Sequence, residues 1–74
     1  MPSEIAVRFG NAIRAIRRRV NISQEELAAR CGLHRTYVSD VELGKRNVSL
    51  ENIERLACAL NISLVDLFEE VSRE

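Results

Sequence analysis

Residues 24–42 have the sequence QEELAARCGLHRTYVSDVE, which is typical of two short helices that cross at a steep angle. Ala28 supplies the small residue that such a crossing requires, and Gly32 supplies the positive φ that a tight connection requires. On the second helix, Val38 and Val41 are three positions apart and therefore face inward together. The stretch predicts a helix-turn-helix.

The positions between these anchors face outward, and their side chains suit the recognition of DNA bases. Arginine can donate two hydrogen bonds to guanine, threonine offers a hydroxyl and a methyl group, and serine allows close approach. Tyrosine can stack on a base or bond to a base or a phosphate. The outward residues are Arg35, Thr36, Tyr37, Ser39 and Asp40. Together with the inward anchors, this face favours a DNA-reading helix over an ordinary helical hairpin with a solvated polar side.

Three further helices are predicted, which makes the fold all-α: a compact bundle of five helices. Ser23 and Glu26 form a capping box, in which the serine hydroxyl accepts from a free backbone N–H and Glu26 reaches back to the Ser23 amide. Asn21, Asn47 and Asn61 each lie two residues before a serine, where asparagine tolerates the left-handed backbone that closes a turn. The serines expected to cap helices are Ser3, Ser23, Ser49 and Ser63.

The composition predicts one domain over residues 1–74 and argues against several classes of protein. Hydrophobic residues make up 46% and charged residues 30%, which is typical of a globular chain. No apolar run approaches the ~20 residues that span a bilayer, and we expect no signal peptide because no charged-then-apolar pattern opens the sequence. No nucleophile–base pair, glycine-rich phosphate loop or cluster of metal ligands occurs. We therefore expect a cytoplasmic protein that is not an enzyme, with no catalytic residues, metal, cofactor or membrane contact.

The net charge of zero hides an uneven distribution along the chain. Residues 1–48 contain nine basic and five acidic residues, a balance of +4, whereas residues 49–74 contain two basic and six acidic residues, a balance of −4. One end of the molecule can therefore meet a polyanion while the other faces elsewhere.

The chain from Phe9 to Phe68 resembles the Cro/C1-type (XRE) helix-turn-helix regulators, whose founding members are phage repressors. Residues 34–47, HRTYVSDVELGKRN, are similar to a narrower group, the small controller proteins of restriction–modification systems. The resemblance implies a bundle of the lambda-repressor-like DNA-binding type.

The resemblance also implies roles for individual residues. Arg35, Thr36 and Ser39 would meet base edges in the major groove, with Tyr37 at the groove wall. Asp40 departs from the more basic faces of some relatives, and it either accepts from a cytosine amine or pairs with Arg35 or another arginine. The residues expected at the DNA backbone are Gln24, His34, Lys45, Arg46 and Asn47; for His34 this follows from its place before the second helix of the motif, where a capping role is also open.

Other side chains invite structural interpretations. Glu42 is expected to pair with Arg17 or Arg30. Three arginines of the first helix can share one face, and one of them is expected to touch a phosphate while the others are solvated. The three are Arg14, Arg17 and Arg18. Cys31 and Cys58 are interpreted as small core residues rather than as a redox pair.

The last helix has more apolar side chains than one inward stripe needs, and we expect a dimerisation region at about residues 60–71. Its predicted interface residues are Ile62, Leu64, Val65, Phe68 and Val71. Two helix-turn-helix motifs related by a two-fold axis would reach successive major grooves ~34 Å apart on near-palindromic operator DNA. The expected function is a homodimeric, sequence-specific transcriptional regulator of restriction–modification genes, with RNA polymerase as a further partner. The alternatives are an antitoxin that also binds a partner protein through its C-terminal end, and an RNA-associated bridging domain.

Overall fold

The computed structural model describes residues 3–74, so Met1 and Pro2 of the predicted domain lie outside the described residues. The described residues form five helices and no strand. The helices are α1 (Glu4–Arg19), α2 (Gln24–Cys31), α3 (Arg35–Glu42), α4 (Leu50–Ala59) and α5 (Leu64–Arg73). The predicted all-α fold is confirmed, and α2 and α3 correspond to the predicted helix-turn-helix. Within these residues, no helix has both the length and the apolar character needed to cross a membrane.

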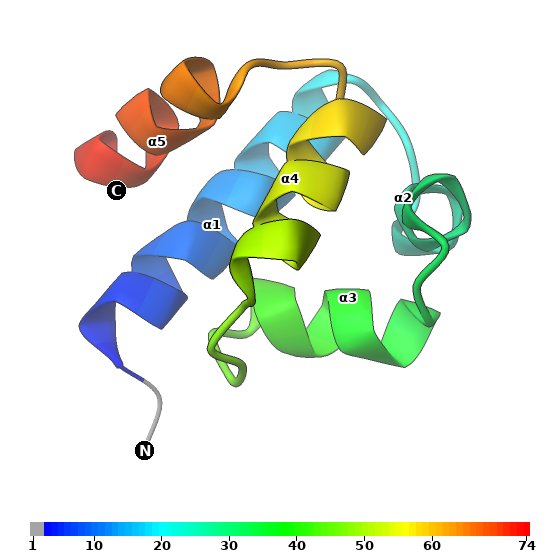
Figure 1. The fold of residues 1–74 in the computed structure, drawn as a ribbon, viewed down its shortest axis with the longest axis horizontal. Coiled ribbons are helices and arrows are strands. Elements are labelled where there is room, and N and C mark those ends of the chain that lie inside the picture. Colours follow the sequence, from blue (N-terminus) through cyan, green and yellow to red (C-terminus); the bar gives the residue numbers. More distant parts are fainter. Residues whose placement is uncertain (1–2) are drawn as a thin grey trace.

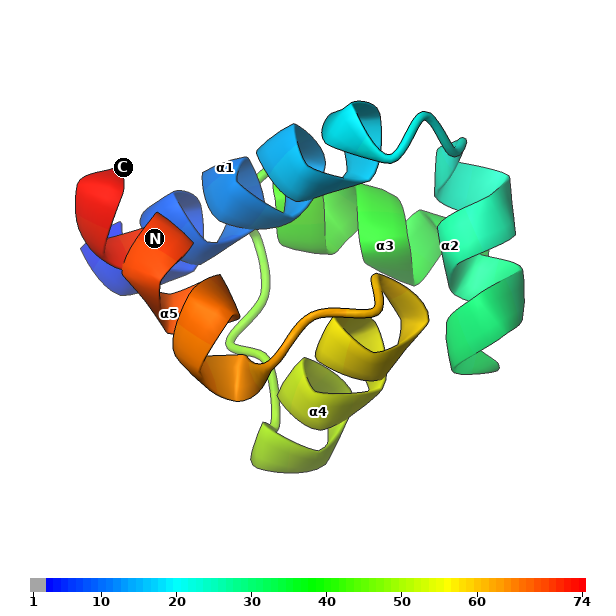
Figure 2. The ribbon, with the colours of Figure 1, turned by 90° about the horizontal axis from the view of Figure 1, so that it is seen from above.

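Helix α1 packs against α3 and α5, while α2 packs against α3 and α4 and crosses α3 steeply. In Figure 1, α2 is seen nearly end-on while α3 lies across the lower part of the view. Figure 2 shows α4 and α5 together on the side of the molecule opposite α1 and α3. The start of α1 and the end of α5 lie at the end of the molecule farthest from α2 (Figures 1 and 2). The helix-turn-helix is therefore well separated from α5.

Local capping explains where four of the helices begin. The hydroxyl oxygens of the four serines accept hydrogen bonds of 3.0–3.2 Å from backbone N–H groups three residues on, at Ser3, Ser23, Ser49 and Ser63. Asn21 and Asn61 have the expected positive φ, at 60° and 58°, but Asn47 does not. The capping box is only half formed, because the Glu26 carboxylate accepts from Arg30 Nε at 3.0 Å, one turn on, instead of reaching back.

The core confirms the inward anchors of the motif. Val38 and Val41 are buried, and Ala28 is buried at the crossing of the helices. Cys31 is also buried, and burial raises the pKa of its thiol. The prediction of a core position for Cys58 is wrong, because this thiol is exposed on α4.

Gly10 lies where α1 and α3 approach each other closely, and the sequence interpretation missed this contact. A Cβ atom at Gly10 would clash with the backbone oxygen of Val41 and lie 2.8 Å from that of Glu42. The available signal was a glycine inside the apolar stripe of a helix, where glycine costs about 1 kcal/mol relative to alanine.

Gly32 has a φ of 68°, as predicted, and a Cβ atom there would meet nothing within 4 Å. Substitution therefore costs only backbone strain. We expect Gly32→Val to lower the free energy of unfolding by about 1–2 kcal/mol, because a β-branched residue resists the left-handed region. DNA affinity should also fall, because α3 is displaced. Urea denaturation and a DNA titration measure the two effects. Gly32→Asn is the matched control and should cost less, since asparagine already adopts this conformation at Asn21 and Asn61.

Candidate nucleic-acid interface

The outer face of α3 presents the side chains that were expected to meet bases. Arg35 and Thr36 are exposed in the first turn, while Ser39 and Asp40 are half-buried one turn later. His34 is the exposed N-cap residue of α3, but its side chain makes no capping hydrogen bond. The capping alternative for the His34 side chain is therefore wrong.

Tyr37 faces outward only in part. It is half-buried, and its ring packs against the hydrophobic core. Its hydroxyl oxygen accepts a hydrogen bond of 3.1 Å from Asn52 Nδ2 on α4. The exposed part of the ring is therefore held in one orientation, and the outward position predicted for Tyr37 is only partly realised.

The loop after α3 folds back onto the outer face of that helix. The Lys45 amide donates to the Asp40 carbonyl oxygen at 2.9 Å. Arg46 Nε lies 3.4 Å from Asp40 Oδ2, and the guanidinium carbon lies 5.2 Å from the centroid of the Tyr37 ring. The partner of Asp40 is therefore Arg46 and not Arg35. The exposed residues of this loop, Lys45, Arg46 and Asn47, lie next to the α3 face.

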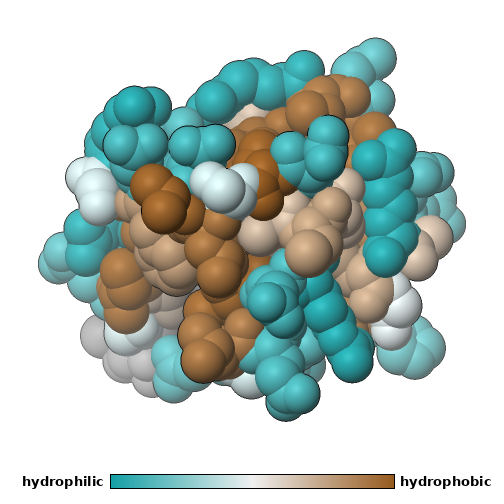
Figure 3. Space-filling view, turned by 45° about the horizontal axis from the view of Figure 1, so that its top comes forward, coloured by the Kyte–Doolittle hydropathy of each residue, from teal (hydrophilic) through white to brown (hydrophobic). Residues whose placement is uncertain are grey.

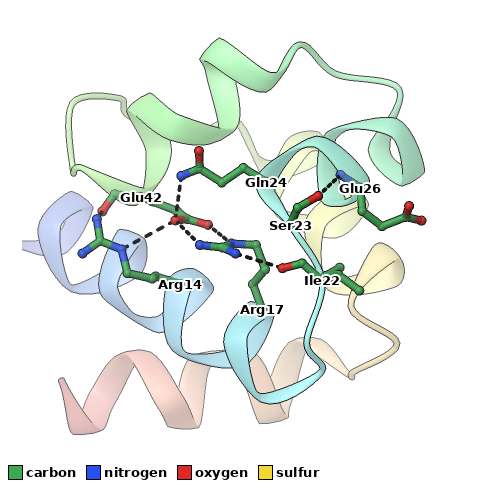
Figure 4. Close-up of polar contacts among 7 residues, drawn as sticks. All are labelled: Arg14, Arg17, Ile22, Ser23, Gln24, Glu26 and Glu42. Carbon is green, nitrogen blue, oxygen red and sulfur yellow. Dashed lines mark hydrogen bonds and ion pairs between the residues drawn. The ribbon is translucent and has the colours of Figure 1, made fainter.

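Glu42, the last residue of α3, is the centre of a buried polar cluster (Figure 4). Arg17 donates to both of its carboxylate oxygens, from Nε at 2.6 Å and from Nη2 at 3.0 Å. Gln24 Nε2 donates to Oε1 at 3.0 Å, and Arg14 Nε lies 3.5 Å from the same oxygen. The expected pairing with Arg17 is confirmed, whereas Arg30 pairs with Glu26. Arg17 is consequently not available as a phosphate contact, since its side chain is only 11% exposed.

The carboxyl group of Glu42 is held in its charged form. Burial alone would raise its pKa, but hydrogen bonds from Arg17 and Gln24 and the charges of Arg17 and Arg14 outweigh burial and lower the pKa. The same hydrogen bond raises the pKa of Arg17. The cluster therefore ties α1, α2 and the end of α3 together through a charged group.

Because the pKa of Glu42 is lower in the folded chain, its stabilisation is complete above the unfolded value of about 4.3 and is lost as the pH falls through the folded value. We expect Glu42→Gln to reduce the slope of unfolding free energy against pH below about pH 4.5. Urea denaturation between pH 3 and 6 measures this slope, with Glu51→Gln on exposed α4 surface as control. Parallel profiles for Glu42→Gln and the parent would contradict the assignment.

The predicted dimer residues divide into two groups. Leu64, Val65 and Phe68 are 40%, 70% and 40% exposed and form what we call the α5 patch. Figure 3 shows apolar side chains gathered over the face made by α4 and α5, with polar side chains around them. Val71 is only 2% exposed and belongs to the core, so its prediction as a free interface residue is wrong. Ile62 is half-buried against the core, and its place in a dimer interface stays a prediction.

Comparisons with known proteins agree with this geometry. A family model described as helix-turn-helix matches residues 13–67. Over 73 residues the chain is 44% identical to the control protein C.MunI of a Mycoplasma species, which covers 97% of this chain and 99% of the relative. It is similar to the structure of the restriction-modification controller protein C.AhdI from Aeromonas hydrophila, with 51% identity, coverage of 85% and 96% of the two chains, and a TM-score of 0.83. It is also similar to C.Esp1396I bound to a 19 base pair DNA duplex, with 31% identity, coverage of 96% and 95%, and a TM-score of 0.90.

Proposed function

This chain belongs to the helix-turn-helix family, and we propose that it is a sequence-specific regulator of transcription that binds duplex DNA. The proposal rests on the outer face of α3, which presents Arg35, Thr36 and Ser39. The hydrophobic core and the hydrogen bonds of the Glu42 cluster hold this helix in place. Support comes from C.Esp1396I, a relative of nearly the same length whose structure contains a DNA duplex. Residues 1–74 act as one DNA-binding domain in this proposal, without catalysis or a cofactor.

On the DNA, the side chains of the α3 face contact base edges and the flanking residues contact phosphates. Arg35 donates to guanine, Thr36 and Ser39 meet neighbouring base edges, and Tyr37 lies at the groove wall. The proposed backbone contacts are Gln24, His34, Lys45, Arg46 and Asn47. The pairing of Arg46 with Asp40 has a direct consequence, because it neutralises the one carboxylate on this face that would repel phosphate.

The proposed active form is a homodimer joined through the α5 patch. The patch lies at the end of the molecule away from α2, so two copies can meet there while both α3 faces remain free (Figure 1). A two-fold axis between the copies requires a near-palindromic operator.

The relatives favour one biological setting over the others. The control protein and the restriction-modification controller proteins among them support control of restriction–modification genes. A cytoplasmic location and RNA polymerase as a further partner complete this proposal. The comparisons give no support to the antitoxin alternative.

A binding selection on random duplex DNA tests the proposal. We expect enrichment of a near-palindromic site whose half-sites are about one helical turn apart. Parallel selections on single-stranded DNA and on RNA serve as controls. Absence of an enriched duplex, or stronger enrichment of RNA, would overturn the proposed function.

The two kinds of contact should respond differently to mutation. Arg35→Ala should cost about 1–3 kcal/mol on the enriched site and flatten the preference at one base position. Arg46→Ala should weaken binding to all sequences similarly and reduce the salt slope by about one phosphate. Titrations at several salt concentrations against the cognate site and single-base variants separate these effects. Unchanged affinity and preference in Arg35→Ala would show that α3 does not read bases through this residue.

A further inference from the structure

The Glu42 carboxylate restricts how the side chain of Gln24 can be oriented. The two side chains come from different helices, and Gln24 Nε2 lies 3.0 Å from Glu42 Oε1. A carboxylate only accepts hydrogen bonds, so the NH₂ group of the amide, and not its carbonyl oxygen, must face Glu42. Figure 4 shows the amide oxygen of Gln24 pointing away from the carboxylate. One amide N–H is thus used inside the protein, and one remains.

The carboxylate is itself held by other groups. Arg17 donates to both of its oxygens, and the Glu42 side chain is only 1% exposed. Gln24 is only half-buried at the start of α2, and the hydrogen bond to Glu42 anchors one side of its amide. A phosphate oxygen, like a carboxylate, accepts hydrogen bonds, so only an N–H can usefully face it.

We propose that Glu42 is a positioning residue for DNA binding, which fixes the amide of Gln24 so that its second N–H donates to a DNA phosphate. This inference rests on the proposed DNA-binding function. If the residue at position 42 can donate as well as accept, the Gln24 amide can rotate by 180°. Its carbonyl oxygen then faces the phosphate, and the two oxygens repel each other. Glu42 itself touches no DNA.

The sign of the effect separates positioning from simple electrostatics. Glu42→Gln keeps the size of the side chain and removes a negative charge. Loss of a negative charge near DNA strengthens binding if charge alone matters. The positioning role instead requires binding to weaken, because a glutamine at position 42 can donate as well as accept and no longer fixes the amide.

The experiment is a double-mutant cycle on the duplex enriched by the selection, with affinities measured by fluorescence anisotropy at one salt concentration. We expect Glu42→Gln and Gln24→Ala each to weaken binding by about three- to tenfold, as for the loss of one hydrogen bond. The double variant should bind like Gln24→Ala. Ile13→Val, a mild change in the buried core, controls for a loss of stability and should bind like the parent at temperatures where it is folded.

Each result is decisive. If Glu42→Gln binds as tightly as the parent or more tightly, or if the two effects multiply in the double variant, the positioning role is wrong. If the parent binds no duplex, the proposed function fails instead, and this inference with it. If Glu42→Gln does not fold, NMR of the parent complex replaces the cycle. There, slow exchange of the Gln24 amide protons supports the proposal, and exchange as fast as at exposed Asn11 overturns it.

Discussion

Replacing Gly10 with alanine is expected to lower the free energy of unfolding by about 3 kcal/mol, even though the same change usually stabilises a helix. Helix propensity alone favours alanine by about 0.5–1 kcal/mol. This gain is outweighed, because the new Cβ would clash with the backbone oxygen of Val41 and would lie only 2.8 Å from the backbone oxygen of Glu42. Backbone oxygens cannot rotate away as a side chain can, so α1 and α3 must separate.

Urea denaturation followed by circular dichroism measures this effect. Asn11→Ala is the matched control, because Asn11 is the exposed neighbour of Gly10 on α1 and should show little change or a small gain. Since α3 moves with the separation of the helices, DNA affinity should fall in parallel. A Gly10→Ala protein as stable as the parent would show that α1 and α3 do not meet in this way.

Aspartate at Val65 and Phe68 is expected to produce a folded monomer that loses operator binding by more than about a hundredfold, because one half-site cannot supply the contacts of two. Both side chains are exposed in the α5 patch, at 70% and 40%. At a two-fold interface each new charge would be buried near its symmetry mate, and like charges there both repel and lose hydration. Val65→Asp is the cleaner single change, because the Phe68 ring also lies 6.4 Å from that of Phe9.

Analytical ultracentrifugation with circular dichroism separates loss of the dimer from loss of the fold. Val20→Asp adds the same charge to an exposed valine outside the patch and should remain a dimer. Val41→Asp should unfold the chain, since Val41 is 1% exposed in the core. A Val65→Asp and Phe68→Asp double variant that still sedimented as a dimer would rule out this interface. The exposed side chains Ile5 and Val7 of α1 would then be the next candidate.

The local features of the chain were sufficient to predict the helices and the turn of the motif. The four capping serines and the positive φ of Gly32 and Asn21 all depend on backbone groups within a few residues. Apolar spacing likewise predicted the inward Val38 and Val41, because periodicity along a helix is a local property. These signals place the outer face of α3 without any knowledge of the rest of the molecule.

Contacts between segments distant in sequence determined the burial of side chains that the local pattern had predicted wrongly. Val71 looked like spare apolar surface, but α5 packs against α1 and buries it. Cys58 looked like a core residue, but α4 turns it to the exterior. For both residues the apolar pattern could not distinguish the core from the surface, because the direction in which a helix faces is set by the helices it packs against.

The same reasoning applies to the polar cluster and to Gly10. The sequence offered Glu42 two arginine partners, and only the crossing of α1, α2 and α3 selects Arg17 and adds Gln24. Gly10 stands among residues that favour a helix, and its small size matters only because α3, about thirty residues later, passes close to it. Short-range hydrogen bonds and side-chain periodicity thus determined the helices, whereas close packing between segments remote in sequence decided which side chains are buried, exposed or paired with one another.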